Sequence, residues 1–208
     1  MRILMLGNSY IFTNDLPAML EKLTGAEVTA HTRGGARLAE QLNPKTKMGA
    51  RTLAALEQET WDYVVLQEMS NAPITSREKF WNSVSALCEK IRAAGAVPVL
   101  YATWAYQDGG KQLASFGMPY EEMYRALTDS YREAAEQNQA LIAEVGTAFY
   151  ERSRTVNLYA PDGSHPNAEG SRLAAQVIAQ TILNHRKEGD SSLKSDCAGI
   201  RETAGSTA

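Results

Sequence analysis

Cysteines are scarce in this chain and long apolar runs are absent. The first absence argues against a disulfide-rich secreted protein, and the second against a membrane-spanning one. Cys88 and Cys197 are the only cysteines among 208 residues. Both are interpreted as unpaired, so a reducing compartment is the simpler expectation. No apolar run approaches the roughly 20 residues that cross a bilayer, and the first residues lack the pattern of an export signal. We therefore expect a cytoplasmic protein without a membrane anchor.

An excess of charge of one sign is also missing. The 21 basic and 24 acidic residues are scattered along the chain, so no surface for nucleic acid or anionic lipid is expected. The three histidines lie far apart and no cysteine has a partner at ligand spacing, so no metal site is predicted. We expect no metal or organic cofactor, and a small neutral or weakly charged molecule as the partner.

Short apolar runs alternate with helical patterns along most of the chain. The first run, residues 2–7 (RILMLG), is typical of a parallel strand that is buried on both faces. Further strands are predicted at residues 27–32, 62–67, 97–103 and 140–145. Helices are predicted at residues 14–24, 36–42 and 49–58, from a Thr75–Glu78 capping box to Gly95, from Pro119 onward, and after Asn167. This alternation predicts an α/β three-layer sandwich around a five-stranded parallel sheet.

Two segments lack such periodicity. Residues 104–118 contain glycines and follow no regular pattern, so we expect a long loop there. From residue 186 onward the chain is polar, with almost no apolar residues, which indicates a disordered tail. The sequence therefore predicts one domain over residues 1–185 and a disordered tail over residues 186–208.

Polar and glycine-containing segments lie in the loops where parallel sheets bind their ligands. Ligands of such sheets bind beyond the carboxyl ends of the strands, so the loops there converge on one edge. The segments are Gly7-Asn8-Ser9, Gly34-Gly35, residues 67–71 (QEMSN) and residues 162–165 (DGSH).

In this order, the four segments resemble the consensus blocks of the SGNH (GDSL-type) hydrolases, over residues 2 to about 185. The resemblance implies a flavodoxin-like fold and an ester-hydrolysing activity. The first block departs from the common pattern, with Gly-Asn-Ser in place of Gly-Asp-Ser. The third block has Gln-x-x-Ser-Asn instead of Gly-x-Asn-Asp, and is similar to the Gln-Gly-Glu-Ser-Asn stretch of sialate O-acetylesterases and related carbohydrate esterases.

Acyl transfer needs a nucleophile, a base and a group that orients the base. A serine hydroxyl is a poor nucleophile at neutral pH, so Ser9 requires a base, and His165 is the candidate. Asp162, three residues before His165, can hold the second imidazole nitrogen. Of the other histidines, we expect His31 to be structural and His185 to be a solvated helix end.

The resemblance also implies an oxyanion hole made by the backbone N–H groups of Ser9 and Gly35 and the side-chain amide of Asn71. Gln67 is a second candidate for the amide donor and for substrate binding. Trp104 follows the fourth predicted strand and is a candidate wall for a sugar or acyl group, the alternative being a plug at the sheet edge. Glu68 is expected to be solvated or paired with an arginine.

The main hypothesis is a serine hydrolase that cleaves carboxylic esters through an acyl-enzyme on Ser9. Short acyl esters are expected, with O-acetyl groups on carbohydrates as one candidate class. A first alternative is thioester or lysophospholipid hydrolysis by the same triad. A second is a non-catalytic, flavodoxin-like module in which Ser9 and Thr13 bind a phosphate. That module is disfavoured because it leaves Asp162 and His165 without a role.

Overall fold

Strand β1 (Arg2–Gly7) is the centre of the fold, because residues 3–7 are all buried and pair with a parallel strand on either side. The computed structural model describes the backbone of residues 1–203 and the side chains of residues 1–189 and 191. Its sheet has the order β2-β1-β3-β4-β5, with every neighbouring pair parallel. The other strands are β2 (Glu27–Thr32), β3 (Tyr63–Leu66), β4 (Val97–Tyr101) and β5 (Leu141–Ala143).

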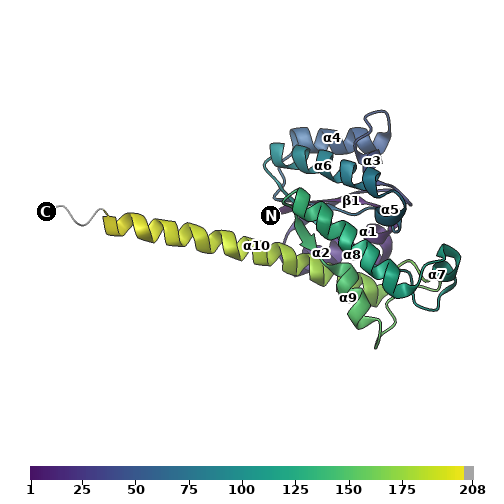
Figure 1. Ribbon diagram of the computed structural model, residues 1–208. Coiled ribbons are helices and arrows are strands. Elements are labelled where there is room, and N and C mark those ends of the chain that lie inside the picture. The colour runs from purple at the N-terminus through teal and green to yellow at the C-terminus, as the bar shows by residue number, and fades with distance from the viewer. Residues whose placement is uncertain (204–208) are drawn as a thin grey trace.

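Helices cover both faces of the sheet, as the predicted three-layer sandwich requires (Figure 1). Ile3 and Met5 of β1 point into the core on one face, and Leu4 and Leu6 into the core on the other, because successive side chains of a strand alternate. The first face is covered by α2 (Leu16–Thr24), α9 (Val145–Arg152) and α10 (Ala168–Thr203). The second is covered by α4 (Lys47–Gln58), α6 (Arg77–Ala93) and α8 (Tyr120–Gln137).

Short helices occupy the loops at the carboxyl edge of the sheet, and some of them correct the sequence-based prediction. The expected loop at residues 104–118 contains helix α7 (Lys111–Phe116). The Thr75–Glu78 capping box is wrong, because Thr75 ends helix α5 (Ala72–Thr75) and its hydroxyl donates to the Asn71 carbonyl. The remaining short elements are α1 (Ser9–Phe12), η1 (Thr13–Asp15) and α3 (Leu38–Gln41).

Helix α10 runs through most of the segment for which the sequence predicts disorder. It continues past residue 186 to Thr203 and projects away from the sheet (Figure 1). Extending a helix that is already packed avoids the cost of nucleation, and residues 186–203 contain no proline. Residues 204–208 of the predicted tail lie outside the described residues.

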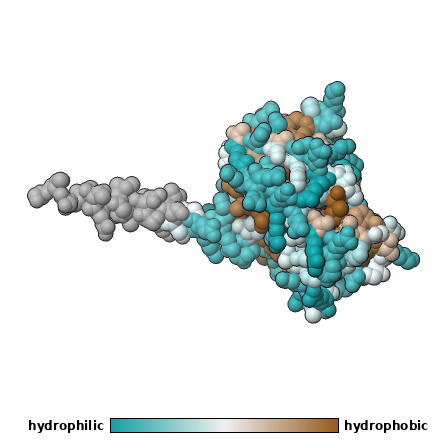
Figure 2. Space-filling view, viewed as in Figure 1, coloured by the Kyte–Doolittle hydropathy of each residue, from teal (hydrophilic) through white to brown (hydrophobic). Residues whose placement is uncertain are grey.

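The visible face of the molecule is mostly hydrophilic, with scattered apolar patches (Figure 2). Within residues 1–189, Phe12 and Leu23 are the large hydrophobic side chains that are exposed. Along the described part of the chain, no helix is both long and apolar enough to cross a bilayer.

Candidate active site

Ser9 lies at the carboxyl end of β1, as the first residue of the one-turn helix α1. Asn8 caps this helix, because its Oδ1 accepts a hydrogen bond from the Tyr10 N–H at 3.1 Å. The Asn8 N–H donates to Oε1 of Gln67 at 2.9 Å. A Cβ at Gly7 would lie 2.7 Å from Ile11 Cδ1 and closer still to Gln67 Oε1, so a larger residue there would displace these side chains. Ser9 is thus presented on a turn that is fixed from two sides.

The structure brings Ser9, His165 and Asp162 into one hydrogen-bonded chain. Ser9 Oγ lies 2.8 Å from His165 Nε2, and His165 Nδ1 lies 2.6 Å from Asp162 Oδ2. An ionised carboxylate can only accept, so Nδ1 carries the proton and Nε2 is left to accept from the serine hydroxyl. This is the arrangement that a serine nucleophile and its base require.

Asp162 is held in its ionised form by the loop that carries it. Its Oδ1 accepts hydrogen bonds from the backbone N–H groups of Ser164, at 3.0 Å, and His165, at 2.9 Å. Partial burial opposes ionisation, but these bonds and the imidazole outweigh it, and the pKa of Asp162 lies below its usual value. The carboxylate therefore stays charged at neutral pH and orients the imidazole.

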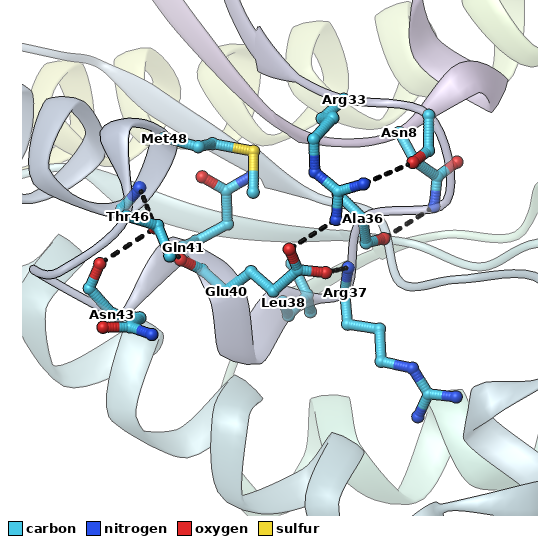
Figure 3. Close-up of polar contacts among 12 residues, drawn as sticks. Asn8, Arg33, Ala36, Arg37, Leu38, Glu40, Gln41, Asn43, Thr46 and Met48 are labelled. Carbon is cyan, nitrogen blue, oxygen red and sulfur yellow. Dashed lines mark hydrogen bonds and ion pairs between the residues drawn. The ribbon is translucent and has the colours of Figure 1, made fainter.

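The departure at Asn8 has a physical reason. Its side-chain Nδ2 donates to the carbonyl oxygen of Ala36 at 3.0 Å (Figure 3), which an aspartate carboxylate could not do. The bond connects the turn before Ser9 to the loop that contains Gly35. Asn8 is 3 % exposed, so the contact is shielded from water.

Two of the three candidate oxyanion-hole residues, Gly35 and Asn71, are at least partly exposed. Gly35 is exposed and has a φ of +65°, whereas Gly34 has no positive φ. A residue at position 35 therefore adopts a conformation that favours glycine. Asn71 is half-buried at the start of α5, and no hydrogen bond of its side-chain amide occurs within residues 1–189. Its amide is free to donate to a bound group.

Gln67 and Glu68 are both buried, which corrects their predicted roles. Gln67 is fully buried; its Oε1 accepts from Asn8 and its Nε2 donates to the Glu68 carbonyl. It supports the nucleophile turn and is not placed to bind substrate. Glu68 is 2 % exposed, and its carboxylate accepts from the N–H groups of Leu38 and Met69. Burial raises the pKa of the Glu68 carboxyl, against the effect of these bonds.

Trp104 lies inside the protein and forms no wall of a cleft. Only 1 % of its surface is exposed, and its ring is stacked between Tyr10, at a centroid distance of 4.6 Å, and Phe149, at 3.9 Å. Its Nε1 donates to the Ser164 carbonyl at 3.0 Å. Trp104 therefore connects the residue after Ser9 with the residue before His165. Sequence reasoning missed this role, because no pattern in the chain links these positions.

The other two histidines lie apart from this chain of hydrogen bonds. His31 is 3 % exposed, and its Nδ1 contacts Oγ1 of Thr52 at 3.0 Å. Burial, with a smaller contribution from Arg51, lowers the pKa of His31 to about 4. His185 is half-buried and its Nδ1 lies 3.0 Å from the Tyr63 hydroxyl, so it is not the solvated helix end that we expected. In the described part of the chain, no group of three or more histidine, cysteine or acidic side chains is arranged to hold a metal ion.

The fold of this chain recurs in solved structures of known proteins. No family model and no curated protein matches the chain. Among solved structures, an acetylxylan esterase from Geobacillus stearothermophilus superimposes with a TM-score of 0.64 at 15% identity, over 87% of this chain and 93% of that one. TesA superimposes with a TM-score of 0.65 at 17% identity, over 88% of this chain and 98% of that one. At these identities the likeness concerns the fold alone.

A third structure is much more similar in sequence. It is described as "a putative SGNH hydrolase from Slackia heliotrinireducens" and is 50% identical. The match has a TM-score of 0.85 and covers 88% of this chain and 98% of that one. The four sequence blocks and the all-parallel, five-stranded sheet agree with this relationship. The chain belongs to the SGNH hydrolase family.

Proposed function

We propose that this protein is a serine esterase that hydrolyses carboxylic esters through an acyl-enzyme on Ser9. The observation that carries the proposal is the chain from Ser9 Oγ to His165 Nε2, at 2.8 Å, and from His165 Nδ1 to Asp162, at 2.6 Å. In the first half-reaction Ser9 Oγ attacks the ester carbonyl carbon while His165 takes its proton. The same proton then passes to the leaving alcohol as the ester C–O bond breaks.

The second half-reaction repeats these steps with water. His165 removes a proton from water as the water oxygen attacks the acyl carbon, and returns it to Ser9 when the acid leaves. In both halves the carbonyl oxygen becomes negatively charged. We assign its stabilisation to the backbone N–H groups of Ser9 and Gly35 and the free amide of Asn71, since fixed donors aimed at developing charge are effective in acyl transfer.

We further propose that the substrates carry short acyl groups, including O-acetyl groups on carbohydrates, and that the enzyme is cytoplasmic. Two observations support the substrate class: the third block, residues 67–71, and the fold shared with an acetylxylan esterase. Thioester and lysophospholipid hydrolysis by the same triad are the competing activities. Cys88 is free and buried, which agrees with a reducing compartment.

A substrate panel with a matched active-site label tests the proposal. Acetylated xylo-oligosaccharides, aryl acetates, long-chain acyl esters, acyl thioesters and lysophospholipids are compared in wild-type protein and Ser9→Ala. We expect the highest kcat/KM on a short-chain ester and none in the variant. A fluorophosphonate should label Ser9 and spare Ser191, an exposed serine on α10. An active enzyme that leaves Ser9 unlabelled would refute the mechanism.

A further inference from the structure

His165 is held on both sides by side chains that come from the nucleophile segment. Tyr10, next to Ser9, contacts Ser164, and Asn14 contacts Pro166. We infer that Tyr10 and Asn14 are positioning residues that keep His165 at hydrogen-bonding distance from Ser9. The inference rests on the proposed function, because it explains how the same site is held together.

The Tyr10 contact fixes the residue before His165. Its hydroxyl lies 2.7 Å from Ser164 Oγ, and its ring meets the His165 ring edge-on at a centroid distance of 5.5 Å. Trp104 stacks on the Tyr10 ring and donates a hydrogen bond to the Ser164 carbonyl. Tyr10 is 3 % exposed, and burial raises its pKa, so the hydroxyl remains neutral. The nucleophile helix and the histidine loop are therefore packed and hydrogen-bonded to each other.

The Asn14 contact fixes the residue after His165. Asn14 Nδ2 donates to the Pro166 carbonyl at 3.1 Å and to Ser171 Oγ at 2.9 Å, which uses both of its amide hydrogens. Asn14 and Asp15 have φ values of +56°. Left-handed backbone is strained at non-glycine residues, and such strain persists only where surrounding contacts impose it. The Asn14 amide supplies such contacts.

The hydrogen bonds of Asp162 cannot set the distance between Ser9 and His165. Asp162 bonds to the backbone and ring of residues in its own loop, so that loop can shift as a unit without losing any of these bonds. Its position relative to Ser9 depends on contacts that leave the loop. Tyr10 and Asn14 make such contacts from within five residues of Ser9. Small errors in this distance matter, because a misplacement of about 1 Å can reduce a rate by 10²-fold.

Two single variants and their combination test the inference. Tyr10→Phe removes the hydroxyl and keeps the aromatic stack, and Asn14→Gly removes the amide while tolerating the left-handed backbone. We expect each to lower kcat about 10-fold, and the double variant about 100-fold or more, with KM nearly unchanged. Thermal midpoints should stay within a few degrees of wild type.

Tyr101→Phe is the matched control. Tyr101 lies in the same aromatic cluster and is buried, but its hydroxyl has no hydrogen-bond partner among the residues that the structure describes. Removing that hydroxyl should leave kcat and KM as they are. The inference is overturned if the double variant keeps kcat within twofold of wild type, or if Tyr101→Phe loses as much kcat as Tyr10→Phe.

Measurements that do not require ester hydrolysis distinguish a failure of this inference from a failure of the proposed function. The rate of fluorophosphonate labelling of Ser9 should fall in parallel with kcat in the two variants. The Nδ1–H resonance of His165 should broaden in the double variant and stay sharp in Tyr101→Phe. If no ester is hydrolysed by wild-type protein, the proposed function fails, while the resonance still reports on the positioning. An equally sharp resonance in wild type and the double variant would overturn the positioning role.

Discussion

Replacing Asn8 by the aspartate that is common in this family should destabilise this protein in a pH-dependent way. The Asn8 amide donates to the Ala36 carbonyl at 3.0 Å, and the side chain is 3 % exposed. In Asn8→Asp that donor is replaced by a carboxylate oxygen facing a carbonyl oxygen. Losing the hydrogen bond costs about 1 kcal/mol, and the unpaired buried charge costs about 2 kcal/mol more. A negative charge at the start of helix α1 is favourable by roughly 0.5 kcal/mol. We therefore expect the free energy of unfolding to fall by about 2.5 kcal/mol at pH 7.5.

The charge-dependent part gives this prediction its signature. The net cost of the charged form, about 1.5 kcal/mol, means that the pKa of the introduced carboxyl is higher in the folded protein than in the unfolded chain. A raised native pKa means that the folded state binds the extra proton. The associated stability is present below the unfolded pKa of about 3.9 and is lost as the pH rises through the folded pKa. The destabilisation should therefore be smaller at pH 4.5 than at pH 7.5, by up to about 1.5 kcal/mol.

Urea denaturation at the two pH values measures this difference. Each variant is compared with wild type at the same pH, so titration of other groups cancels. Asn8→Ala is the control, since it loses the same donor without introducing a titratable group, and its destabilisation should be equal at both pH values. A loss of stability in Asn8→Asp that is also equal at both pH values, or absent, would show that the Ala36 contact does not discriminate between amide and carboxylate.

Three further predictions concern single side chains. Asn71→Ala should lower kcat by roughly 10²- to 10³-fold with little change in KM, because its amide would act only on the charged intermediate; steady-state kinetics that show an unchanged kcat would remove it from the oxyanion hole. Asp162→Asn should fold with a nearly unchanged thermal midpoint but lose roughly 10³- to 10⁴-fold in kcat, because His165 would no longer be held with its proton on Nδ1. Near-normal turnover would contradict the proposed triad. Burial lowers the pKa of His31 from 6.5 to about 4, so as the pH falls the unfolded chain binds the proton before the folded protein does. The free energy of unfolding should therefore fall by up to about 3 kcal/mol between pH 7 and pH 4. A His31→Leu variant that shows the same fall in urea midpoint would exclude His31 as its cause.

The sheet and the placement of Ser9, Asp162 and His165 at one edge were predictable because their signals are local. A buried parallel strand is a continuous apolar run, and all five predicted strands are present with boundaries shifted by a few residues at most. Ser9, Asp162 and His165 follow or precede predicted elements, so the topology alone brings them to one edge. Their catalytic roles stay a prediction.

Burial at the site was not predictable, because it depends on partners far away in the sequence. A tryptophan after a strand has the same sequence pattern whether it lines a cleft or is enclosed. Trp104 is enclosed by Tyr10 and by Phe149, and Phe149 lies on helix α9, which the sequence analysis did not predict. Gln67 is close to Asn71 in sequence, yet it is directed inward because the Asn8 backbone supplies its partner. Such pairings become visible only when the fold is known.

The two halves of the triad are made at different times. Ser9 and His165 are 156 positions apart, so at about 5–20 residues per second a ribosome needs roughly 8 to 30 s between them. During that interval a nascent chain carries Ser9, the proposed nucleophile, without the histidine that is proposed as its base. The residues that hold the base, Ser164 and Pro166, emerge with it, while their partners Tyr10 and Asn14 have already been synthesised. If the proposed mechanism holds, no partial chain that ends before His165 can display the esterase activity.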